Sequence, residues 1–359
     1  MSAAGQTEPE PRVRWRRAAL GAVLAVLVAS GVVALIGNAA GFGDVRETLE
    51  GGRPAWLAIS LAGQLLVFSA YARVYRAAVR FEGGPSVAAP LAVRVVLGSF
   101  ALTQLVAAGG AAGLAVGYWA LRKLGFDRRE AAVRVIGLNT MVYLVFGLLG
   151  WTAALLALVA GEVPPALALP WLALVPVLLV AAWWFTDEPR VRGWAVPRGG
   201  WPRRGLAIGV SAAWWVRRAL PTAEGRTMAA AAAVYWLADA VSLWAGLRVF
   251  GEDVPPAALV LAYATGYVAQ LTPLPFVATG GVDAATTFAL TAVGVPLEAA
   301  LLGVVAHRLF AFWLPVVPGL VLAAFLPATG QALARAATTR PPEPEVSGPS
   351  ASWSSRTPR

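Results

Sequence analysis

The chain has 359 residues, of which 58% are hydrophobic and only 13% are charged, and its mean hydropathy is +0.66. It contains no cysteine and one histidine, His307, which excludes disulfides, thiolate chemistry and a Cys/His metal cluster, so no metal or cofactor is expected. The net charge of +10 would suggest nucleic acid in a soluble protein, but the arginines flank long uncharged segments as membrane topology requires, so no nucleic-acid partner is expected.

Long uncharged segments predict an all-α fold, a polytopic bundle of membrane helices, because a bilayer core of about 30 Å needs roughly 20 apolar residues. The predicted crossings are 18–36, 54–72, 135–161, 163–186, 228–249 and 301–326. They place a transmembrane domain over 18–328, after a cytoplasmic N-terminal segment, 1–17. The tail, 329–359, which is Pro/Ser-rich from residue 341 onward, is predicted to be disordered and cytoplasmic.

Basic residues orient these crossings, since cytoplasmic loops carry an excess of Lys and Arg. Four arginines precede the first crossing, which is longer than the apolar region of a cleaved signal peptide. The arginine-rich loop 187–226 is predicted to be cytoplasmic, with a short interfacial helix around Trp214 and Trp215. A plasma-membrane protein with both termini in the cytoplasm follows.

Two further apolar segments are predicted to be re-entrant hairpins. Segment 95–121 has basic residues at both ends and Gly109-Gly110 at its middle, so it is expected to enter from the cytoplasm and return there. Segment 254–282 follows an acidic outer loop and is broken near Gly280-Gly281, so it is expected to enter from outside.

The two hairpins share a sequence pattern. Each has a Gln-Leu pair, a Gly-Gly break, an apolar arm, a Gly turn and a Glu-Ala-Ala that opens a long span; Gln104 and Gln270 are equivalent. The same elements in opposite orientation indicate an inverted repeat, in which broken helices meet near the midplane and form the substrate site. The alternative is a chance likeness in an Ala/Gly-rich chain.

Asp239 places a carboxylate in the middle of a span, which costs several kcal/mol unless it is paired, neutralised or facing water. Arg308 is its predicted partner, and Arg94, at the mouth of the first hairpin, is a second candidate. Such a pair either fixes helix register or lines a polar cavity that holds a lipid head group or relays a proton. His307 is either pH-sensitive or simply packed and hydrogen-bonded.

The remaining polar candidates each have two interpretations. Asp283 either lines the cavity or caps the helix that follows. Gln104 and Gln270 either bond to each other or contact substrate. The predicted substrate-binding residues are Asp239, Arg308, His307, Asp283, Gln104, Gln270, Gly109, Gly110, Gly280, Gly281 and Arg94.

A row of arginines lies at spacings i, i+3 and i+7 on one helix face near the cytoplasm: Arg73, Arg76 and Arg80. They are predicted to contact the phosphates of anionic phospholipids. Ordinary snorkelling of long basic side chains is the alternative.

Several landmarks together resemble one family. They are the arginine-bearing second span, the Gly-Gly hairpin leading to Leu121-Arg122-Lys123-Leu124-Gly125, the Leu271-Thr272-Pro273-Leu274-Pro275 break, and the closing Ala306-His307-Arg308-Leu309. From about residue 15 to residue 328 the chain resembles the lysylphosphatidylglycerol synthase transmembrane region, or flippase-like domain, family. The resemblance implies lipid translocation, and the chain has no room for the soluble transferase domain that some relatives carry.

The leading expectation is therefore a lipid flippase or transporter that moves an anionic or modified phospholipid, or a polyprenyl-linked lipid, between leaflets. The alternatives are a non-catalytic membrane subunit supporting a separately encoded lipid or sugar transferase, a membrane-embedded lipid-modifying transferase, and a small-solute transporter. Catalysis is not expected, because no metal-ligand spacing links the few acidic residues and the histidine. Membrane phospholipids are the expected partners, and no P-loop for ATP is visible.

Overall fold

The computed structural model describes residues 51–105, 111–187, 191, 201–271, 280–324 and 326–338, and the elements within these ranges are all helical. Five described helices are long and apolar enough to cross a membrane, which confirms five of the predicted crossings. They are α3 (Trp56–Arg80), α6 (Arg128–Val159), α7 (Pro165–Phe185), α10 (Ala223–Val249) and α13 (Leu297–Ala324). The predicted first crossing, 18–36, and the N-terminal segment lie outside the described residues.

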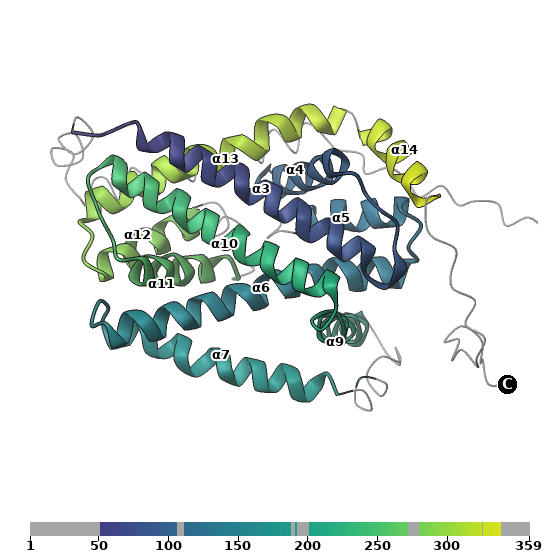
Figure 1. Cartoon of the computed structure of the whole chain (residues 1–359), viewed down its shortest axis with the longest axis horizontal. Helices are drawn as coiled ribbons and strands as arrows, with labels where there is room; N and C mark the ends of the chain where they lie inside the picture. The colour runs from purple at the N-terminus through teal and green to yellow at the C-terminus, as the bar shows by residue number, and fades with distance from the viewer. Residues whose placement is uncertain are drawn as a thin grey trace, which may run out of the picture.

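Shorter helices complete the bundle (Figure 1). They are η1 (Phe81–Gly83), α4 (Ala89–Leu105), α5 (Ala111–Lys123), α9 (Trp201–Ala219), α11 (Pro256–Tyr267), η2 (Val268–Leu271), α12 (Val282–Ala292) and α14 (Leu326–Ala337).

The periphery of the bundle is apolar. On α7, Val177, Val180 and Trp183 expose 63%, 70% and 67% of their surfaces. Contact between water and an apolar face of this kind is unfavourable. Lipid tails suit these aliphatic side chains, and Trp183 and Trp184 lie near one end of the helix, where interfacial aromatic residues belong. The chain is thus an all-α polytopic membrane bundle, as predicted.

Helices α3 and α10 run antiparallel at the centre of the bundle (Figure 1). Small residues allow this close approach: a Cβ atom at Gly63 would lie 2.9 Å from the carbonyl oxygen of Ala238. At one end the backbone N–H of Arg53 donates to Val249 O at 2.7 Å. These contacts fix the register in which polar side chains of the two helices meet.

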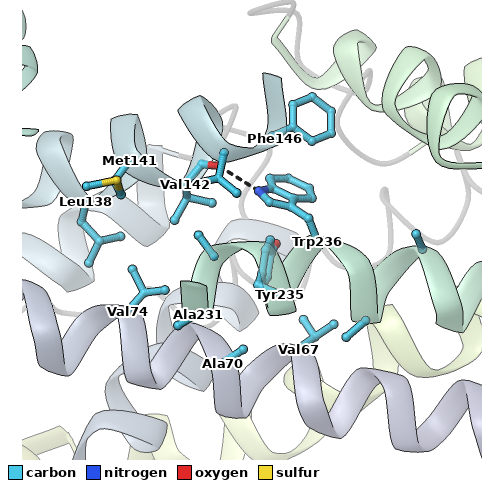
Figure 2. Close-up of a cluster of buried hydrophobic side chains, with 14 of the residues drawn as sticks. Val67, Ala70, Val74, Leu138, Met141, Val142, Phe146, Ala231, Tyr235 and Trp236 are labelled. Atoms are coloured by element: carbon cyan, nitrogen blue, oxygen red, sulfur yellow. Dashed lines mark hydrogen bonds between the residues drawn. The ribbon is translucent and has the colours of Figure 1, made fainter. Parts of the chain in front are cut away.

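An apolar and aromatic core joins α6 to this central pair. Figure 2 shows Val67, Ala70 and Val74 of α3 on one side, and side chains of α6 and α10 on the other. The indole Nε1 of Trp236 donates to Val142 O at 2.9 Å, and its ring lies 4.4 Å from that of Phe146, centroid to centroid. Satisfying the indole N–H in this way lets a large aromatic side chain fill the core.

Two pairs of short helices occupy the predicted hairpins. Helices α4 and α5 pack together, as do α11 and α12, and each helix is only about 17–26 Å long at 1.5 Å per residue. Each is therefore shorter than a bilayer core of about 30 Å. The Gly109-Gly110 turn and residues 272–279 lie outside the described residues, so re-entry into the membrane stays a prediction.

The packing relates the two halves of the bundle. When α3, α4, α5 and α6 are matched with α10, α11, α12 and α13, the contacts of one half have counterparts in the other. Thus α4 packs against α13 while α11 packs against α6, and α5 packs against α6 while α12 packs against α13. Reciprocal packing of this kind is what an inverted repeat produces.

The glycine turns that open the long spans are also alike. Gly125 and Gly294 have φ angles of 88° and 93°, which side chains with a Cβ rarely adopt. The residue after each glycine, Phe126 or Val295, donates its N–H to the carbonyl five residues earlier at 3.3 and 3.2 Å. Both predicted Gly turns are therefore confirmed with the same geometry.

Two amphipathic helices cover one end of the bundle. Helix α9 includes the predicted interfacial segment, and its Trp215 packs against Gly137 of α6 and edge-on against Phe81. Helix α14 corrects the prediction that residues from 329 onward are disordered. Its Ala- and Leu-rich sequence favours helix, and Leu333 is fully buried where α14 packs on α5 and α4. The tail beyond residue 338 lies outside the described residues.

Candidate functional site

Asp239 lies near the middle of α10 and is 7% exposed. Its carboxylate accepts hydrogen bonds from Gln64 Nε2 on α3 and from the Tyr263 hydroxyl on α11, both at 2.5 Å. Neutral donors from two neighbouring helices therefore hold the buried carboxylate, instead of an arginine.

The predicted Asp239–Arg308 pair is wrong. Arg308 Nε donates to Asp283 Oδ1 at 2.5 Å, because α12 begins at Val282 and places Asp283 in its first turn, facing α13. Asp283 makes an ion pair, and α12 has no side-chain cap at its N-terminus. Arg94, the second candidate partner, is exposed on α4 and does not line the cavities described below.

His307 joins Asp239 to a pair of hydroxyls. Its Nε2 lies 3.7 Å from Asp239 Oδ1, and its Nδ1 lies 3.0 Å from Ser242 Oγ. The Ser242 hydroxyl in turn lies 2.9 Å from that of Ser60 on α3. Close packing of α10 and α13 makes this possible, since a Cβ on Gly246 would lie 2.5 Å from the Gly303 carbonyl oxygen.

A small polar cavity of about 90 Å³ lies where these helices meet. It collects groups from both halves of the chain. The predicted residues that line it are Asp239, Arg308, His307, Asp283, Gln104 and Gln270, and the structure adds Gln64, Thr103, Tyr263 and Thr286. Gly280 and Gly281 lead directly into α12, and Gly280 is buried. Gly109 and Gly110 lie outside the described residues.

A larger cavity of about 360 Å³ adjoins the small one, and Phe100, Thr103, Tyr235, Tyr267 and Gln270 line both. Apolar and aromatic side chains dominate its wall. The Tyr75 hydroxyl is buried at this wall and has no hydrogen-bond partner within the described residues. Together the two cavities offer a polar compartment beside an apolar one.

Arg134 is a buried residue that the sequence analysis did not single out. Only 1% of its side chain is exposed, and its guanidinium donates to Glu130 Oε1 at 2.8 Å and to the carbonyls of Ala78 and Phe81, both at 2.9 Å. It thereby satisfies the carbonyls that end α3. The Glu130–Arg134 spacing of i, i+4 was the available signal.

The arginine row is at the surface. Arg73, Arg76 and Arg80 border a depression of about 330 Å³, together with Glu224. Arg76 Nε donates to Val87 O at 2.8 Å, and Arg80 lies 4.0 Å from Glu224. Arg73 is exposed.

Two direct contacts of Asp239 were also missed. Gln64 carried a signal, because an amide stands out in the apolar segment 54–72. Tyr263 carried none, since a tyrosine is unremarkable among the apolar residues of its segment.

The fold and its buried polar site define a class, namely a polytopic membrane protein with two matched helical halves around an intramembrane cavity. A family model described as the lysylphosphatidylglycerol synthase TM region matches residues 22–319. The chain belongs to this family of integral membrane proteins, as its motifs suggested. A search of curated proteins found no match.

Proposed function

We propose that the protein moves an anionic or modified phospholipid, or a polyprenyl-linked lipid, between the leaflets of the plasma membrane. One observation carries this proposal: a polar cavity holding Arg308, Asp283 and Asp239 adjoins a larger aromatic and apolar cavity inside a membrane bundle. A lipid needs both surroundings, because its head group is polar and its chains are not.

In this proposal Arg308 binds the phosphate of the head group. A guanidinium has five N–H donors, and the Asp283 bond uses only Nε–H, so other donors are available to a phosphate. The amides of Gln104 and Gln270 contact head-group hydroxyls, while the acyl chains stay in the bilayer. Arg73, Arg76 and Arg80 gather anionic lipid at the cytoplasmic leaflet.

The proposed orientation has both termini in the cytoplasm, and the chain acts as a transporter without catalysing a reaction. A separately encoded transferase that produces the lipid is a natural partner, since modified lipids need an enzyme to make them.

We predict that reconstituted protein lets a membrane-impermeant reductant bleach fluorescent phosphatidylglycerol beyond the outer-leaflet half of the label. Replacing Arg308 by Ala should slow this second phase by about tenfold or more, because a charge-assisted hydrogen bond to phosphate contributes about 1.5–3 kcal/mol. Asp239→Asn should also slow it. Thr152→Ala is the control, since this exposed hydroxyl lies far along α6 from the cavity-lining residues and donates to Leu148 O of its own helix.

Kinetics equal to those of protein-free vesicles, for both anionic phospholipids and polyprenyl phosphates, would exclude unassisted translocation. That outcome would favour the alternative of a membrane subunit that supports a separate transferase.

A further inference from the structure

Asp239 and His307 form a buried pair whose charge is set by protons. The two side chains are 11% and 9% exposed, and Nε2 lies 3.7 Å from Oδ1. The other bonded partners of Asp239 in the described part of the chain, Gln64 and Tyr263, are neutral donors. No arginine is bonded to this carboxylate there, since Arg308 is bonded to Asp283.

The net charge of the cavity depends on whether this pair holds a proton. Arg308 and Asp283 neutralise each other, and tyrosines are neutral at ordinary pH. With a neutral imidazole the cavity carries a net charge of −1, and one bound proton brings it to zero. The titratable or charged groups that face the pair from the packed helices are Tyr235 on α10, Tyr263 and Tyr267 on α11, Asp283 on α12 and Arg308 on α13; α3 and α4 contribute the neutral Gln64, Ser60, Thr103 and Gln104.

A second negative charge inside a bilayer is costly, so a cavity that takes up an anionic head group also favours a proton on this pair, and the empty site returns without that proton. We propose that this proton is a co-substrate: the Asp239–His307 pair binds it together with an anionic lipid head group, and the two cross the membrane together. The coupling rests on the proposed lipid transport, whereas joint binding does not require transport.

The proton has two positions within the pair. In one, a protonated imidazole donates from Nδ1 to Ser242 Oγ and points Nε2–H at the Asp239 carboxylate. In the other, the Nε2–H bond has broken and an Oδ1–H bond has formed, which leaves a neutral histidine and a neutral carboxylic acid. Atoms and charge balance in both, so the site keeps its proton while its bonds rearrange.

Lipid binding and proton binding reinforce each other in this geometry. A singly charged phosphate at Arg308 adds −1 to the cavity, so losing the proton costs more with lipid bound than without it. The reverse holds by linkage: a protonated pair binds the anionic head group more tightly. Lipid and proton together carry no net charge, so their joint movement is electroneutral.

In this proposal the proton and the lipid take separate routes. On the His307 side, the hydroxyls of Ser242 and Ser60 lead towards the end of the bundle where α3 begins, a region expected to lie outside. On the Asp239 side, the pair faces the cavity that receives the head group. Two buried hydroxyls can relay a proton through hydrogen bonds, but they leave no room for a lipid.

The test uses full-length protein in vesicles of phosphatidylcholine and phosphatidylglycerol that carry fluorescent phosphatidylglycerol. With the exterior more acidic than the interior, inward movement should accelerate by up to about tenfold per pH unit, and the reversed gradient should slow it. An imposed potassium diffusion potential should leave this ratio unchanged. The double variant Asp239→Asn/His307→Gln, which keeps polar side chains at both positions but cannot bind the proton, should bring the ratio of its remaining lipid movement to one, whereas Thr152→Ala should preserve the wild-type ratio.

Joint binding is measured separately, by titrating short-chain phosphatidylglycerol into detergent-solubilised protein in two buffers of different ionisation enthalpy. Wild type should take up a measurable fraction of a proton per lipid, and the double variant Asp239→Asn/His307→Gln should take up none. Movement of lipid at a rate independent of the pH gradient would overturn the coupling and leave the proposed function standing. If neither lipid movement nor proton uptake is found, both proposals fail.

Discussion

Arg134 shows how a single buried cation can organise the end of a helix. It bonds to Glu130 on its own helix and to two carbonyls at the end of α3, and its guanidinium lies 4.4 Å from the centre of the Phe126 ring. If Arg134 were removed, each of these partners would lose a contact. Water could not readily replace it, because the site is buried. The residue therefore stabilises the junction of α3 with α6.

We predict that Arg134→Ala lowers the free energy of unfolding by about 3 kcal/mol, because two buried carbonyls lose their donor. The apparent Tm in detergent, followed by tryptophan fluorescence, should fall by roughly 5–10 °C. Arg204→Ala, which removes an exposed arginine from α9, should leave Tm nearly unchanged. Equal Tm values for the two variants would contradict the assigned role of Arg134.

At the same scale, single residues were easier to identify from the sequence than their partners. Asp239, Arg308 and His307 could be selected because charged or titratable groups are rare inside spans. Pairing them correctly required the rotation and depth of each helix, which residue spacing does not give. Asp283 and Arg308 meet only because α12 begins where it does, and Asp239 meets Gln64 through the register of α3 and α10.

Among the elements, the contact between α10 and α13 is the one that builds the site. Gly246 and Gly303 lie against each other's helices, and the backbone N–H of His307 would lie 3.2 Å from a Cβ on Gly246. Backbone atoms cannot yield as a flexible side chain can. The position of His307 on α13 thus depends on the absence of a side chain at Gly246 of α10.

We predict that Gly246→Ala separates α10 from α13, costs about 1–3 kcal/mol of stability and slows lipid movement, because the added Cβ would lie 2.5 Å from Gly303 O. Gly98→Ala on α4 is the matched control, since no described atom lies within 4 Å of its Cβ position. Replacing that glycine should leave stability equal or higher by about 0.5–1 kcal/mol. Thermal unfolding and the vesicle assay together check both variants; wild-type behaviour of Gly246→Ala would contradict the argument.

Elements were predicted well where length and charge decide the outcome. The spans of α6, α7, α10 and α13 follow from apolar runs that soluble helices seldom reach. The helix of α14 was missed because the Pro/Ser-rich composition of the distal tail was extended over the Ala-rich residues before it. Burial of Leu333 against the bundle stabilises that helix, and no local signal reveals such a contact.

For the whole molecule, the decisive property is the relation between the two halves. Their matched contacts and their two identical glycine turns support the repeat that the sequence pattern predicted. The halves must also enter the membrane from opposite sides if the charge distribution sets their orientation.

We predict that cysteines placed at Asp127, after the first helix pair, and at Ala292, the last residue of the second pair, are labelled from opposite sides of the membrane. The natural chain has no cysteine, so single-cysteine variants have no background. In intact cells an impermeant maleimide should react with a cysteine at position 292 and with one at position 162, the reference for the outer side. Cysteines at position 127 and at position 204, the reference for the inner side, should react only after permeabilisation. Labelling of positions 127 and 292 from the same side would exclude the inverted orientation.

The two cavities differ in size although the halves that surround them match. Helices α3 to α6 form most of the wall of the 360 Å³ cavity, while α10 to α13 form most of the wall of the 90 Å³ cavity. Two halves with matched helix contacts thus enclose unequal spaces, one wide and one narrow. Under the proposed lipid transport, exchanging these shapes between the halves would close the wide cavity and enlarge the narrow one. On that proposal, the asymmetric conformation seen here is one end of an alternating-access cycle, and the same conformation with the two halves exchanged is the other end.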